Sequence, residues 1–156
     1  MSAPAMMEGQ SWMSRDIVHG IEIHAEPKTV FDTIASRSGL AAFWTPDVQG
    51  DDTQGGELSF GFSGSPVRLP IPVNRLDPPR EVAWDCPGGF PHWEGTSVAW
   101  SVQPSKHGSK VIFRHLGFPD EQPEYDFGSI NLTWAQIVAR LKEVVEAGGA
   151  PNPALT

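Results

Sequence analysis

Alternation of large apolar side chains along several short segments is the feature that most constrains this fold. Every second residue is apolar or aromatic within residues 57–63, 80–86, 94–103 and 109–116. Successive side chains of a strand point to opposite faces, so each alternating set lies on one face of a sheet. The sets comprise Leu58, Phe60, Phe62, Val82, Trp84, Cys86, Val98, Trp100, Val102, Val111, Phe113 and His115. We therefore expect a sheet with a strongly aromatic inner face.

A long amphipathic helix follows these strands. Apolar residues recur at helical spacing over residues 127–147 and form one stripe, which predicts a helix that packs on the sheet. The stripe consists of Trp134, Val138, Leu141 and Val145. The pair Gly148-Gly149 directly after it is typical of a helix end.

The N-terminal part predicts another strand and two short helices. Residues 17–25 alternate between apolar and polar positions, which is typical of a strand. Pro27 then stands near the first position of a helix, where its missing N–H costs nothing. We expect Ser38-Gly39 to break this helix and a second helical turn to occupy residues 40–44.

Prolines mark one further strand, residues 67–76. Pro70 and Pro72 are two positions apart, so both missing hydrogen-bond donors fall on the same side of the strand. We expect this strand to lie at an edge of the sheet or to be unpaired on that side. With an extended segment at residues 47–50, the chain predicts an α+β fold with a curved antiparallel sheet of six to seven strands.

The charge of the chain excludes some partners. Its 156 residues carry a net charge of −8, and the basic residues are scattered singly. Nucleic-acid binding needs a concentrated positive patch, and acidic membrane surfaces repel such a chain, so we expect neither as a partner. A single cysteine, Cys86, excludes an intramolecular disulfide and fits the reducing cytoplasm.

The domain organisation is simple. Residues 1–16 have no signal-peptide pattern and read as an N-terminal tail, and residues 150–156 read as a C-terminal tail. Residues 17–149 form the single predicted domain. No segment is long and apolar enough to span a bilayer, so we expect a cytoplasmic protein.

A series of short motifs resembles a known family in order and spacing. The motifs are Pro27 with Val30-Phe31, Trp44-Thr45-Pro46, Gly55-Gly56, Leu76-Asp77-Pro78-Pro79, Val82-Ala83-Trp84, Trp93-x-Gly95-Thr96, His115-x-Gly117-Phe118 and Trp134. Together they resemble the START-like helix-grip superfamily, also called SRPBCC. Within it, the chain is similar to stand-alone domains related to the C-terminal domain of the activator of Hsp90 ATPase, the AHSA1-like family.

This resemblance implies a hydrophobic cavity between the sheet and the C-terminal helix. Proteins of the superfamily use such a cavity for lipids and other apolar ligands. The candidate lining residues are Trp44, Phe60, Phe62, Trp84, Trp100, Phe113, His115, Phe127, Trp134, Val138 and His19. The alternative is that these side chains fill the space themselves, because protein interiors are close-packed.

Two histidines are the main polar candidates. His19 and His115 are predicted to face inward, toward the same end if the first and last strands pair antiparallel. They could orient a ligand or act as acid and base, or they could be hydrogen-bonded core residues. No residues have the spacing of a metal site or of a phosphate-binding loop, so we expect no metal and no cofactor and assign no catalytic residue.

These observations favour non-enzymatic binding of a small hydrophobic or aromatic molecule, by a monomer or a homodimer. One alternative is a cyclase or aromatase that uses the cavity histidines. Another is a protein-interaction module for an Hsp90-type chaperone. The chain has no room for the separate N-terminal domain with which the eukaryotic activator makes its main chaperone contact, so we expect that role less.

Overall fold

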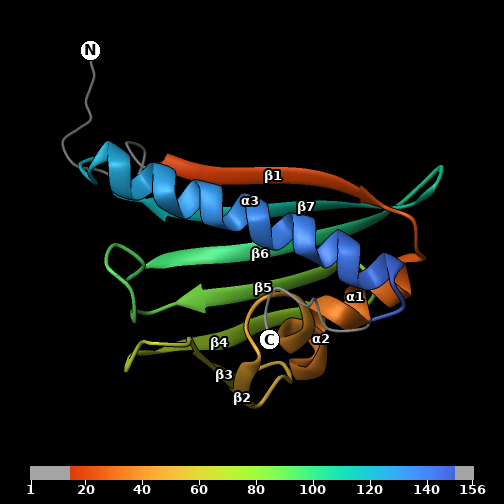
Figure 1. Ribbon diagram of the computed structural model, residues 1–156, viewed down its shortest axis with the longest axis horizontal. Coiled ribbons are helices and arrows are strands. Elements are labelled where there is room, and N and C mark those ends of the chain that lie inside the picture. Colours follow the sequence, from red (N-terminus) through yellow and green to blue (C-terminus); the bar gives the residue numbers. More distant parts are fainter. Residues whose placement is uncertain (1–14, 150–156) are drawn as a thin grey trace.

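Seven antiparallel strands form one sheet in the computed structural model, which describes residues 15–149 (Figure 1). The strands are β1 (Arg15–Ile23), β2 (Asp47–Gly50), β3 (Glu57–Gly61), β4 (Arg68–Asp77), β5 (Glu81–Cys86), β6 (Thr96–Ser105) and β7 (Gly108–Phe118). Their order in the sheet is β1-β7-β6-β5-β4-β3-β2. The first strand therefore closes one edge beside the last, and the short β2 forms the other.

The sheet confirms the predicted inner face. Each of the alternating residues is buried except Phe62, which follows the end of β3 and is half-buried. The ends of the strands differ from the predicted ends by a few residues. The first strand begins at Arg15, so Arg15 and Asp16 belong to the sheet, and the rest of both predicted tails lies outside the described residues.

Two short helices, α1 (Pro27–Ala35) and α2 (Arg37–Phe43), follow β1. Pro27 occupies the start of α1, as predicted. The break between the helices is at Ser36 and not at the predicted Ser38-Gly39. The Ser36 hydroxyl accepts a hydrogen bond from the Gly39 backbone N–H at 3.0 Å and caps α2. Gly39 serves close packing instead, because an added Cβ would lie 2.0 Å from the Thr33 carbonyl oxygen.

The strand with two prolines is an interior strand, which corrects the expectation of an edge. β4 pairs with β3 along residues 68–72 and with β5 only from Val73 onward. Pro70 and Pro72 therefore lie where β4 has a strand neighbour on one side only. The missing donors had predicted incomplete pairing, and that part of the expectation is confirmed.

The long helix α3 (Glu124–Glu146) lies across one face of the sheet over β1, β7 and β6, and its C-terminal end meets α1 and α2 (Figure 1). Its apolar stripe is buried as predicted. The helix begins three residues earlier than expected, with Glu124 and Asp126 in a first turn that favours negative charge. No helix within residues 15–149 is long and apolar enough to cross a membrane.

Candidate functional site

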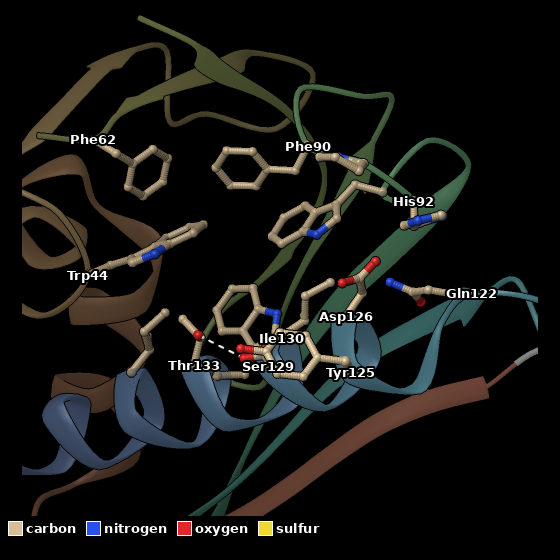
Figure 2. A pocket seen from close by; sticks show the side chains of 14 residues that line it. Trp44, Phe62, Phe90, His92, Gln122, Tyr125, Asp126, Ser129, Ile130 and Thr133 are labelled. Carbon is tan, nitrogen blue, oxygen red and sulfur yellow. Dashed lines mark hydrogen bonds between the residues drawn. The ribbon is translucent and has the colours of Figure 1, made fainter. Parts of the chain in front are cut away.

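A pocket of about 590 Å³ opens between the N-terminal half of α3 and the loop that joins β5 to β6 (Figure 2). Residues 87–95 form this loop, which we call the β5–β6 loop. The volume is in the range of small-molecule binding pockets. The lining residues are Trp44, Phe62, Phe90, Pro91, His92, Trp93, Gln122, Tyr125, Asp126, Ser129, Ile130, Thr133, Trp134 and Ile137.

Five aromatic side chains in this lining form a closed cluster. The members, which we call the aromatic cluster, are Trp44, Phe62, Phe90, Trp93 and Trp134. Taken in that order, successive ring centroids are 5.9, 5.4, 5.2 and 6.0 Å apart, and the last ring is 5.1 Å from the first. These separations are typical of favourable aromatic pairs, so the rings support one another around the pocket.

The chain positions this cluster from four separate segments. Trp44 caps the end of α2, Phe62 follows β3, and Trp134 comes from the buried stripe of α3. The β5–β6 loop supplies Phe90 and Trp93, and Trp93 is buried. Trp93 therefore anchors the loop while Phe90 remains partly open to the pocket.

One residue of this loop has an unusual backbone. His92 has a φ of 70°, in the left-handed region that non-glycine residues rarely adopt. Local strain of this kind persists where the surroundings fix it, and it occurs often in ligand-binding loops. The next residue, Trp93, is buried, and His92 lies at the rim of the pocket (Figure 2).

Polar side chains gather on one wall of the pocket. Asp126, Ser129 and Thr133 share one face of α3, and the Thr133 hydroxyl donates to the Ser129 carbonyl oxygen at 2.9 Å. Gln122 precedes the helix and is only 3% exposed. Neither atom of its side-chain amide has a hydrogen-bond partner among the described residues. An unpaired buried amide is costly, so this group is a candidate for contact with a ligand.

His115 belongs to the core beneath the pocket. The Trp134 indole N–H donates to His115 Nδ1 at 3.0 Å, and His115 Nε2 lies 2.8 Å from the Thr96 hydroxyl. That hydroxyl donates its proton to the Trp93 carbonyl at 2.7 Å, so it accepts from Nε2. Burial lowers the pKa of His115 from 6.5 to about 3. The residue is a neutral, fully bonded core histidine that ties together two members of the aromatic cluster.

The other predicted candidates divide between pocket and core. Trp44, Phe62 and Trp134 line the pocket, whereas the following lie in the packed core: Phe60, Trp84, Trp100, Phe113 and Val138. Phe127 is half-buried, with the Arg15 guanidinium 4.5 Å from its ring centre. His19 is also half-buried, and its Nε2 lies 3.3 Å from the Asn131 carbonyl oxygen. Neither His19 nor His115 lines the pocket.

Sequence reasoning missed the polar wall. None of Gln122, Asp126, Ser129 and Thr133 is among the predicted lining residues. The signal that could have found part of this wall is helical phase, because Asp126 and Thr133 lie roughly a quarter turn from the apolar stripe and not opposite it.

The other candidate sites in the described chain have fewer features of a ligand-binding or catalytic site. A second hollow of about 410 Å³ lies between α1, α2 and the end of α3, and no aromatic residue lines it. Within residues 15–149, no group of three or more His, Cys, Asp or Glu side chains could hold a metal ion. Cys86 is buried, and burial raises the pKa of its thiol to about 12, so it is not an activated nucleophile.

Comparison with known proteins confirms the fold. The family model described as "Activator of Hsp90 ATPase homolog 1-like protein" matches residues 24–146. The Aha1 dimer from Colwellia psychrerythraea is 26% identical, with a TM-score of 0.75 over 86% of this chain and 98% of that chain. No curated protein matches the chain.

Two more distant structures share the fold alone. Protein MLL2253 from Mesorhizobium loti is 15% identical, with a TM-score of 0.73 over 85% of this chain and 98% of that chain. DynU16, a protein of the dynemicin biosynthetic locus, is 17% identical, with a TM-score of 0.71 over 87% of this chain and 48% of that chain. The helix-grip architecture therefore occurs in both compact and longer chains.

Proposed function

The chain belongs to the family of activator of Hsp90 ATPase homolog 1-like proteins, and from that premise we propose that it binds a small hydrophobic or aromatic molecule. The ligand occupies the pocket between α3 and the β5–β6 loop. The expected cytoplasmic location and monomeric or homodimeric state form part of this proposal. The Aha1 relative from Colwellia psychrerythraea is a dimer.

The aromatic cluster is the observation that carries this proposal. Five rings, each in contact with its neighbours in the cluster, border the pocket opposite its polar wall. A ligand that buries about 200 Å² of apolar surface there gains on the order of 5 kcal/mol before the cost of association. Because association itself costs several kcal/mol, a small aromatic probe should bind weakly, with a dissociation constant of about 1 mM or higher, and a larger natural ligand should bind more tightly.

The geometry favours binding over catalysis. The predicted acid–base pair of a cyclase was His19 and His115, and neither side chain reaches the pocket. With both ring nitrogens bonded and its pKa near 3, His115 is also a poor proton acceptor. The chaperone alternative requires an apolar contact surface. The large exposed apolar side chains of the described chain lie on three separate segments: Val18 on β1, Val67 before β4, and Tyr125 and Leu132 on α3, where Tyr125 belongs to the pocket itself.

Native mass spectrometry of the purified protein, before and after denaturing extraction, tests the proposal. We expect an apolar molecule that is retained in the native state and lost on extraction. Thr133→Trp should fill the pocket and abolish retention, because Thr133 lines it on the exposed side of α3. Leu132→Trp is the matched control, since Leu132 directly precedes Thr133, is also exposed and does not line the pocket.

Two results would contradict the proposal. One is a clean apo mass together with no binding of any aromatic probe. The other is equal loss of the retained molecule in both tryptophan variants, which would place the ligand elsewhere.

A further inference from the structure

We propose that the ligand of this pocket is an organic cation, an aromatic molecule that carries a protonated amine. The inference rests on the proposed function and adds the charge and the orientation of the ligand. The aromatic body lies against the aromatic cluster, and the amine lies at the polar wall beside Asp126 and Gln122. Figure 2 shows this division, with Trp44, Phe62 and Phe90 on one side of the pocket and the polar pair on the other.

Asp126 gives the pocket its negative charge. Its carboxylate makes no hydrogen bond or ion pair with another described residue. Lysine and arginine are absent from the lining residues, so no side chain of fixed positive charge balances it within the pocket. A charged group at the edge of an apolar pocket attracts a ligand charge of the opposite sign more strongly than it would in open water.

Charged residues near the pocket strengthen the preference for a cationic ligand. Asp120, Glu121 and Glu124 are exposed in the same segment, and the chain as a whole carries a net charge of −8. Arg15 is the cation packed against this segment, and its guanidinium donates to the backbone carbonyls of Pro119 and Gln122. Because Arg15 is held there and does not line the pocket, the field at the entrance favours cations.

The aromatic cluster suits a cation as well as an apolar body. The faces of tryptophan, tyrosine and phenylalanine rings attract positive charge within about 6 Å of the ring centre. Trp93 and Trp134 both line the pocket, and their rings are stacked with an interplanar angle of 25°. An amine bound beside Asp126 therefore has aromatic ring faces within the same pocket.

Gln122 supplies the second acceptor. Its buried amide has no partner among the described residues, and a half-turn about the last side-chain torsion exchanges its oxygen and nitrogen, so the oxygen can face the pocket. An ammonium group has three donors, and Asp126 and Gln122 offer acceptors on the same wall. A carboxylate ligand would instead face Asp126 and leave both charges unpaired.

Three naphthalene probes of nearly equal size test the charge preference: 1-naphthylmethylamine, neutral 1-naphthalenemethanol and anionic 1-naphthoate. Calorimetric titration at pH 8 keeps ordinary imidazole charge out of the comparison. We expect the amine to bind about tenfold more tightly than the alcohol and about a hundredfold more tightly than the carboxylate. Equal affinities for the amine and the carboxylate would overturn the inference, while the alcohol's binding would still support the proposed function.

Two matched variants test the location of the charge. Asp126→Asn should remove most of the amine preference and weaken alcohol binding much less, whereas Asp120→Asn, outside the pocket, should change the amine preference less than about twofold. Equal effects of the two substitutions would show a diffuse field and overturn the role of Asp126. Gln122→Met should weaken amine binding about fivefold and alcohol binding less. Equal loss for both probes would overturn the role of Gln122. Failure of all three probes to bind the unmodified protein would overturn the proposed function itself.

Discussion

Acidification should destabilise the protein through His115, and replacing that residue should remove the effect. His115 is fully buried, and its pKa is about 3 in the folded state against 6.5 ordinarily. Below pH 6.5 the imidazole of His115 is protonated in the unfolded chain but stays neutral in the folded chain. The free energy of unfolding is therefore highest above pH 6.5 and falls as the pH is lowered toward 3. At pH 5 the loss amounts to about 2 kcal/mol, and it is insensitive to the folded pKa as long as that lies below about 4.

Urea denaturation followed by circular dichroism at pH 8 and pH 5 measures this loss. We expect the unmodified protein to lose about 2 kcal/mol more between these two conditions than His115→Gln does. Carboxylates that titrate over the same range contribute equally to both proteins and cancel in the difference. His107→Gln, in an exposed turn, is the control and should behave like the unmodified protein.

Equal pH dependence of the unmodified protein and His115→Gln would refute the reasoning. It would mean that His115 takes up a proton in the folded state, which the hydrogen bond from the Trp134 indole to Nδ1 forbids. NMR titration of the His115 ring provides the same test without a substitution. A ring that titrates between pH 6 and 7 would contradict the bonded, neutral state.

Three further predictions concern stability and reactivity. Trp134→Ala should lower the free energy of unfolding by about 3–5 kcal/mol, because Trp134 is buried on the stripe of α3; a loss below about 1 kcal/mol would contradict that placement. Gly128→Ala should stabilise α3 by about 0.5–1 kcal/mol, since a Cβ there meets open space, whereas Gly39→Ala should cost about 1–3 kcal/mol through its clash with Thr33; denaturation curves that reverse this order would show the packing to be wrong. Cys86 should resist iodoacetamide at pH 8 in the folded state and react rapidly in urea, because burial raises its pKa to about 12; alkylation at similar rates in both states would show that the thiol is exposed.

Local patterns in the sequence predicted most of the fold. The alternation around Trp84, Trp100 and Phe113 predicted their burial because a strand has only two faces. Pro27 predicted the start of α1 because proline fits only the first turn of a helix. The exact break between α1 and α2 depended on the Ser36 cap, and several other residues in that segment suit a cap equally well.

The pocket was harder to predict because it depends on which aromatic residues the fold leaves partly uncovered. Alternation places Phe60 and Phe62 on the same face of β3, yet one is in the core and the other lines the pocket. That difference depends on where β3 ends and on how the β5–β6 loop folds back toward α3. Neither is a local property, so no pattern in the sequence could separate the two residues.

The orientation of the histidines was partly predictable. β1 and β7 pair antiparallel, with Ile17 opposite His115 and His19 opposite Phe113, so the two imidazoles face inward near each other in register. Their partners come from other elements: Asn131 for His19, and Thr96 and Trp134 for His115. The choice between a core histidine and a site histidine therefore depended on tertiary contacts.

An NMR titration of isotope-labelled protein with 1-naphthalenemethanol tests the central claim most directly. The account predicts saturable shifts of the backbone amides in two segments that border the pocket, residues 90–93 and 126–133. Residues 29–39, which border the second hollow, should remain unshifted. An unchanged spectrum, or shifts confined to residues 29–39, would contradict a binding site between α3 and the β5–β6 loop.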